Sequence, residues 1–256
     1  MVTASAGACL FKIAAICYNT LRMKFAEDIR EAIRIGLVSA RANILPMVVL
    51  WAMAGSLVVA YYRVASVSAA LDVVARWQIG SGWIAAFLNR VFFLGILPGV
   101  FLLAQKSLRP RRVWLVIALQ TLWCGTWGVV TDGWYRLLAF LLGEGCDVLT
   151  LTLKTLLDQF AFTALLNAPA NALFFFWLSQ DMSWANCHRH CPHDIVRGMI
   201  LPNLVTNWCV AFPVVFALYA LPVPLQVQVS GFTSAFWVLV CLQIGACCAR
   251  KVEDAR

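Results

Sequence analysis

The chain has 256 residues, of which 62% are hydrophobic and only 12% are charged. Soluble domains average about 45–50% apolar and about 25% charged residues, so a water-facing domain of this size is excluded. In lipid every backbone polar group needs a partner inside the protein, which leaves helices or a closed barrel. The apolar runs are about 20 residues long, which is the length of a membrane-spanning helix and not of a barrel strand. We therefore predict an all-α, polytopic membrane helix bundle.

The first 43 residues precede the predicted bundle. Residues 1–24 contain no acidic residue and form a poor signal peptide, so we interpret them as a disordered extension or as a mis-started segment upstream of Met23. Residues 25–43 fit an amphipathic helix at the membrane interface. Its apolar positions recur every four residues, at Phe25, Ile29, Ile33 and Leu37.

About six transmembrane helices are predicted within residues 44–249, followed by a charged tail at 250–256. The predicted spans cover about 44–62, 84–105, 113–131, 155–178, 199–220 and 225–248. The third helix could continue past Gly133, because residues 137–142 are also apolar. Gly95 and Gly99 form a small-residue pair that favours close helix packing in the second span.

The positive charges predict the orientation. With six spans, fifteen Lys and Arg residues fall on the face that carries both termini, and five fall on the opposite face. Cytoplasmic loops carry the excess of Lys and Arg, so both termini are predicted on the cytoplasmic or equivalent side. The net charge of +8 is accordingly attributed to loops that face anionic lipid, and no nucleic-acid partner is expected.

Polar side chains inside the predicted spans are the candidate functional residues. They are costly in lipid and face a bundle interior or water. The set comprises Arg90, Asp132, Arg136, Lys154, Thr155, Asp158, Gln159, Thr163, Asn167 and Asn171. The five charged members are predicted to converge on one end of the bundle, with Lys154 or Arg90 as the ionic partner of Asp158. Two interpretations stay open: interhelical contacts that fix helix register, and a polar lumen for small solutes or ions.

One loop is rich in metal-binding side chains. Cys187, His190, Cys191 and His193 are weak candidates for zinc, because structural zinc sites usually draw ligand pairs from two separate segments. We therefore expect no metal centre and no other cofactor. No phosphate-binding loop or partnered nucleophile is found, and we do not expect an enzyme.

A series of motifs resembles the Mpv-seventeen / peroxisomal membrane protein twenty-two family over roughly residues 85–248. The residues that carry the resemblance are Gly128, Trp134, Tyr135, Asp158, Gln159, Trp184, Asn207, Trp208, Pro213 and Pro224. The chain departs from the family pattern at Val129 and Asp132, where the family has Pro and His. The resemblance implies a small organelle-membrane protein with channel activity for small solutes and a role in metabolite balance.

The sequence thus predicts a weakly selective channel in the lipid bilayer, with a non-conducting scaffold or assembly partner as the alternative. The extra span near 44–62 and the poor targeting segment favour a bacterial cytoplasmic (inner) membrane. A mitochondrial inner membrane or a peroxisomal membrane is the alternative location. The sequence leaves a homo-oligomer open.

Overall fold

The computed structural model describes residues 27, 29–31, 33–34, 37–38, 41, 44–104, 112–179, 182–183 and 200–235. Every regular element among these residues is a helix, as the composition predicts. The chain forms two compact units, Met1–Ala42 with Leu166–Cys209, and Asn43–Leu165 with Val210–Arg256. The second unit contains most of the described residues and the polar contacts discussed below, except the pairs Arg34–Glu31 and Asn167–Asn171.

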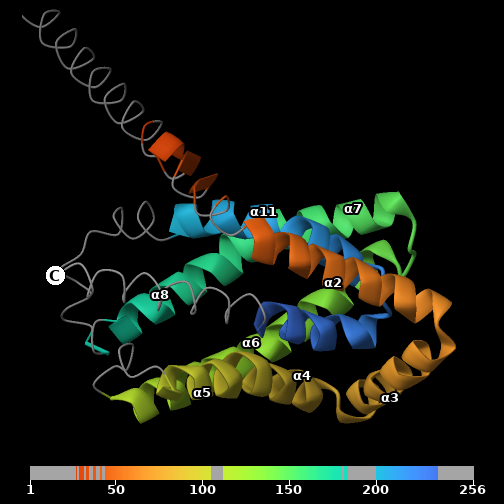
Figure 1. The fold of residues 1–256 in the computed structure, drawn as a ribbon, viewed down its shortest axis with the longest axis horizontal. Helices are drawn as coiled ribbons and strands as arrows, with labels where there is room; N and C mark the ends of the chain where they lie inside the picture. The colour runs from red at the N-terminus through yellow and green to blue at the C-terminus, as the bar shows by residue number, and fades with distance from the viewer. Residues whose placement is uncertain are drawn as a thin grey trace, which may run out of the picture. The chain divides into compact units, whose positions relative to one another are not determined.

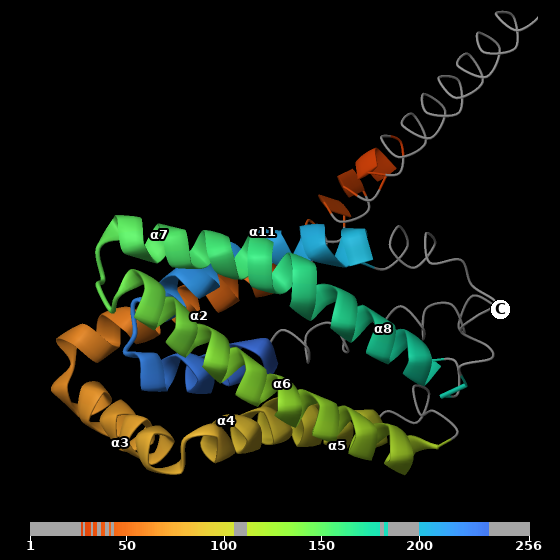
Figure 2. The same ribbon diagram turned by 180° about the vertical axis from the view of Figure 1, so that it is seen from behind.

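The helices follow one another with few interruptions (Figures 1 and 2). In chain order they are α2 (Ile44–Arg63), α3 (Ala65–Ser81), α4 (Trp83–Arg90), the π-helix η1 (Val91–Ile96), α5 (Leu97–Ala104), α6 (Val113–Leu142), α7 (Val148–Leu157), the π-helix η3 (Asp158–Asn167), α8 (Ala168–Ser179) and α11 (Leu201–Tyr219). Residues 223–235 are also helical. The described residues between 27 and 41 are helical, and there Arg34 forms an ion pair with Glu31.

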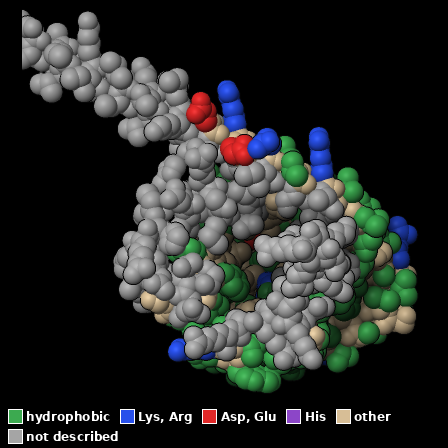
Figure 3. Space-filling view, turned by 60° about the vertical axis from the view of Figure 1, so that its left-hand side comes forward, with side chains coloured by type: hydrophobic (Ala, Val, Ile, Leu, Met, Phe, Trp, Pro, Cys, Tyr) green, Lys and Arg blue, Asp and Glu red, His purple; other side chains and the backbone are tan. Residues whose placement is uncertain are grey.

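Three helical stretches among the described residues are long and apolar enough to cross a membrane. They are Trp83–Ala104, Val113–Leu142 and Val148–Leu178. A fourth candidate is the pair Met47–Arg63 and Ala65–Ser81, which is bent by 102°. Many large hydrophobic side chains on these helices are exposed, including Phe140 at 84% and Trp114 at 70%. Hydrophobic side chains also cover much of the described surface that faces the viewer in Figure 3. Such a surface suits lipid and not water.

Two predicted span boundaries differ from the observed helices. The third helix continues to Leu142, as the apolar residues beyond Gly133 indicated. The fourth begins at Val148 and not near 155, because Asp147 caps it by accepting a hydrogen bond from the Thr150 backbone N–H. This bond to the carboxylate lowers the pKa of Asp147.

A helix, α3, occupies the segment between the predicted first and second spans, where the sequence predicts only a connection. The backbone is extended at Val64 and then enters α3, which ends at Ser81 and is followed by Gly82 as its C-cap. Gly82 has a φ of +55°, a conformation that glycine adopts without strain, and α4 begins directly after it. The turn brings Gln78 of α3 into the interior of the unit, where it is 0% exposed.

Small residues bring α6 close to the helix formed by α4, η1 and α5. A Cβ atom at Gly95 would meet Thr121, and one at Gly99 would meet the Ile117 side chain. Both glycines therefore face α6, as their four-residue spacing predicts. Pro98 leaves the Leu94 carbonyl without its helical donor, and the Gln120 side chain of α6 donates to that oxygen at 3.3 Å.

Three connections meet at one end of this unit. The Tyr62 hydroxyl, near the end of α2, donates to the Ala220 carbonyl at 2.6 Å. The Cys146 thiol, in the loop between α6 and α7, lies 3.7 Å from the same carbonyl and 3.7 Å from the Tyr62 oxygen. The ends of α2, α6 and α11 therefore lie together.

Candidate functional site

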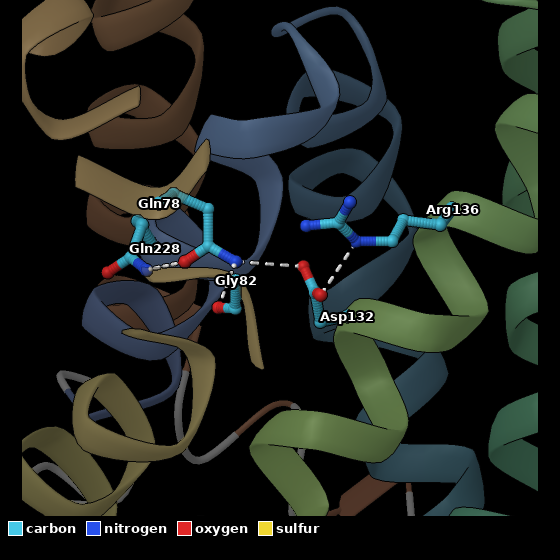
Figure 4. Close-up of polar contacts among 5 residues, drawn as sticks. All are labelled: Gln78, Gly82, Asp132, Arg136 and Gln228. Carbon is cyan, nitrogen blue, oxygen red and sulfur yellow. Dashed lines mark hydrogen bonds and ion pairs between the residues drawn. The ribbon is translucent and has the colours of Figure 1, made fainter. Parts of the chain in front are cut away.

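A buried carboxylate on α6 joins two neighbouring helices. Asp132 is 5% exposed, and its Oδ2 accepts from Arg136 Nε at 2.8 Å, one turn further along α6. Its Oδ1 accepts from Gln78 Nε2 of α3 at 3.1 Å. Figure 4 shows Gln78 between Asp132 and Gln228, with Arg136 on the far side of the carboxylate. The side chain of Arg136 is 51% exposed, so the ion pair reaches the surface of the described structure.

The hydrogen bonds continue from Gln78 through two more amides. Gln228 Nε2, from helix 223–235, donates to Gln78 Oε1, and Gln228 Oε1 accepts from Asn89 Nδ2 at 2.7 Å. The Asn89 side chain packs against Gly231, because a Cβ there would overlap its Oδ1. These contacts form one chain of polar groups across α3, α4, α6 and helix 223–235.

Arg90, the last residue of α4, forms a second group with helix 223–235. It is 8% exposed, and its guanidinium donates to Ser230 Oγ at 2.8 Å and to Ser234 Oγ at 3.3 Å. The Ser230 hydroxyl in turn donates to the Val227 carbonyl at 2.9 Å. The Arg90 stem packs on Gly128 of α6, where a Cβ would meet Arg90 Cγ.

Asp158 is the centre of a third group. It is 4% exposed, and it accepts from the Tyr219 hydroxyl at 3.0 Å and from Gln159 Nε2 at 2.9 Å. The Lys154 ammonium lies 6.0 Å from the centre of the Tyr219 ring. Such a distance fits a cation–π contact.

The predicted ionic partner of Asp158 is therefore wrong. Among the described residues, neither Lys154 nor Arg90 brings a nitrogen within 4.0 Å of an Asp158 oxygen. Tyr219 and Gln159 supply the hydrogen bonds instead, because the Arg90 guanidinium is directed to the serines of helix 223–235. Arg90 and Asp158 still interact electrostatically over a longer distance.

The predicted polar stripe of the fourth span divides at the boundary between the two units. Thr155, Gln159 and Thr163 are buried, whereas Asn167 and Asn171 are half-buried and bond to each other at 2.6 Å. The Thr155 hydroxyl donates to the Leu151 carbonyl in its own helix. Residues 158–167 adopt a π-helix, in which the backbone hydrogen bonds join residues five apart. Such segments occur frequently at functional sites.

Five residues of the three groups around Asp132, Arg90 and Asp158 were not among the candidates predicted from the sequence. They are Gln78, Asn89, Tyr219, Gln228 and Ser230. Gln78 lay in a segment predicted to be a loop. Asn89, Gln228 and Ser230 lay inside predicted spans, so the cost of polar side chains in lipid could have identified them. Tyr219 gave no such signal, because tyrosine is common near the ends of membrane helices.

The residues of the family-like motifs occupy several places. Gly128 lies against the Ala86 carbonyl, Trp134 stacks on Phe162 with ring centres 5.1 Å apart, and Tyr135 meets Tyr219 edge to face at 5.4 Å. Asn207, Trp208 and Pro213 lie on α11, and Pro224 lies in the first turn of helix 223–235. Trp184 and the metal candidates Cys187, His190, Cys191 and His193 fall outside the described residues. Within the described part of the chain, no three His, Cys, Asp or Glu side chains are placed to hold a metal ion.

Comparison with known proteins gives no relative: no family model, no curated protein and no solved structure matches this chain.

Proposed function

We propose that the protein is a six-span membrane protein that passes small hydrophilic solutes or ions through the polar interior of the unit Asn43–Leu165 with Val210–Arg256. The observation that carries this proposal is a set of buried polar atoms with no hydrogen-bond partner among the described residues, which includes Asn89 Oδ1, Arg90 Nε and Gln226 Oε1. An unsatisfied polar atom costs several kcal/mol in lipid. Water that enters from one end would satisfy all three.

The meeting of Tyr62, Cys146 and Ala220 supports the six-span topology. With six spans, the end of the first, the loop between the third and fourth, and the turn between the fifth and sixth share the non-cytoplasmic face. Contacts among these three places are what that arrangement requires. The positive-inside bias then supports both termini on the cytoplasmic side.

The motif series around Gly128 and Asp158 supports membership of the Mpv-seventeen / peroxisomal membrane protein twenty-two family as part of the same proposal. Membership would bring with it a role in metabolite balance. The extra N-terminal span still favours a bacterial inner membrane over an organelle membrane.

A non-conducting scaffold is the second candidate, and one observation favours it. The chain of hydrogen bonds from Arg136 through Asp132, Gln78 and Gln228 to Asn89 connects several helices without any solute. Polar contacts between membrane helices average about 0.6 kcal/mol and reach about 1.7 kcal/mol, so such a network can serve packing alone.

Solute flux into liposomes that contain the purified protein tests the proposal. Gln228→Leu places an apolar side chain beside Asn89 and Gln78, and an apolar constriction blocks permeation by excluding water. We expect Gln228→Leu to abolish flux while the melting temperature stays close to that of the parent protein. Thr126→Val is the control, because the exposed Thr126 hydroxyl bonds only to its own helix.

The opposite result would identify the scaffold. Gln228→Leu would then lower the melting temperature, and the well-folded parent protein would show no flux of any small solute.

A further inference from the structure

Arg90 carries a charge inside a candidate span, and no counter-charge among the described residues is in contact with it. The residue is 8% exposed and lies within the span Trp83–Ala104. Charged side chains at such positions pair with an opposite charge, a backbone carbonyl or water. Among the described residues, both hydrogen-bond partners of its guanidinium are neutral serine hydroxyls, Ser230 and Ser234.

The carboxylates of this unit are engaged elsewhere. Asp132 forms its ion pair with Arg136. Asp158 accepts from Tyr219 and Gln159, and it acts on Arg90 only over a longer distance. Among the described residues, no carboxylate oxygen lies within 4.0 Å of the Arg90 guanidinium.

The geometry also leaves donors for a ligand. Arg90 Nε is buried and has no partner in the described part of the chain, and a guanidinium has more N–H groups than its two serine bonds use. Ser234 accepts from Arg90, so its own proton can be donated to a further acceptor. Gly128 holds the Arg90 stem against α6, which limits the freedom of the side chain to swing toward Asp158.

We propose that Arg90 and Ser234 bind a small monovalent anion, such as chloride, nitrate or a short carboxylate. If solutes pass through the protein, this site makes anions the preferred solutes, and this preference rests on the proposed function. A single guanidinium without a contacting carboxylate is neutralised by one negative charge. Charge-assisted hydrogen bonds from Nε and from the serine hydroxyl would hold the anion.

Anion-dependent thermal stability of the purified full chain tests binding directly. The melting temperature is measured in detergent against increasing chloride, nitrate or gluconate at constant ionic strength. A ligand that binds only the folded state raises it in a saturable way. We expect chloride and nitrate to do so, whereas gluconate is too large to enter. Identical curves in chloride and gluconate would overturn the site.

Three variants assign the effect to Arg90. Arg90→Gln should abolish the response to chloride, and Arg136→Gln, which changes an arginine already paired with Asp132, should keep it. If Arg90→Gln does not fold, Ser234→Ala replaces it and should weaken the apparent chloride affinity about tenfold through one lost charge-assisted hydrogen bond. An unchanged response in Arg90→Gln or Ser234→Ala contradicts the proposal.

Flux measurements separate this site from the proposed function. Saturable chloride binding without flux through liposomes keeps the anion site and refutes the passage. Flux together with a melting temperature that ignores the anion refutes the site and keeps the passage.

Discussion

The bond between Tyr219 and Asp158 leads to a prediction at the scale of a single residue. Tyr219→Phe removes one of the donors to the buried carboxylate of Asp158. In the parent protein the Tyr219 hydroxyl oxygen lies 3.0 Å from Asp158 Oδ1. Leaving such an acceptor unsatisfied costs about 1–3 kcal/mol of unfolding free energy. Unfolding of the purified protein in detergent measures this loss.

The matched control is Tyr62→Phe, since the Tyr62 hydroxyl also donates to an oxygen but sits on an exposed side chain. Water can replace that bond, so we expect a loss below about 1 kcal/mol. Combining Tyr219→Phe with Asp158→Asn should cost less than the sum of the two single losses, because the two side chains interact. Additive losses would show that the hydroxyl and the carboxylate do not interact.

Glycine packing on α6 gives a prediction at the scale of the elements. A Cβ at Gly128 would meet the Ala86 carbonyl and the Arg90 stem, and a backbone oxygen cannot move aside. Gly128→Ala should therefore destabilise the protein by about 1–3 kcal/mol through overpacking. It should also displace Arg90 from its serine partners. The melting temperature without chloride reports the overpacking, and the rise of the melting temperature with added chloride reports the displacement of Arg90.

Gly133 lies in the same helix and serves as the control. No atom lies within 4 Å of a Cβ built there. Alanine favours a helix over glycine by up to about 1 kcal/mol, so Gly133→Ala should be neutral or slightly stabilising. Equal destabilisation by both substitutions would place the effect in helix α6 itself and not in its contact with α4.

Membrane topology is the prediction at the scale of the whole molecule. The native Cys146 is exposed in the loop between α6 and α7, and the six-span arrangement places it on the non-cytoplasmic face. In a variant without the other cysteines, a membrane-impermeant thiol reagent should label Cys146 from that face. Cysteines introduced at Arg111 and Lys251 should react from the opposite face. Labelling of Arg111→Cys and Lys251→Cys from different faces would rule out an even number of spans.

The amino-acid sequence by itself determined the class of the fold. A chain with 62% hydrophobic and 12% charged residues must bury its backbone polar groups in helices if lipid surrounds it. Local signals also predicted the extension of α6 and the close approach at Gly95 and Gly99. Six spans remain a prediction, since three or at most four candidates lie among the described residues.

Only the tertiary structure decided which polar side chains meet. Asp158 is opposite in charge to Arg90 and Lys154, and the three residues have similar predicted depths. The sequence therefore favoured an ion pair between Asp158 and one of the two cations. The structure instead directs Arg90 to Ser230 and Ser234, and Asp158 to Tyr219, because helix 223–235 contacts Arg90 and α11 contacts Asp158. The sequence did not predict helix α3, which is bent by 102° from α2 and carries the Gln78 side chain that bonds to Asp132. Periodicity gives the face of a helix on which a side chain lies, but the partner depends on which helices pack together. Contacts that span from 54 to 150 residues of sequence decide that packing.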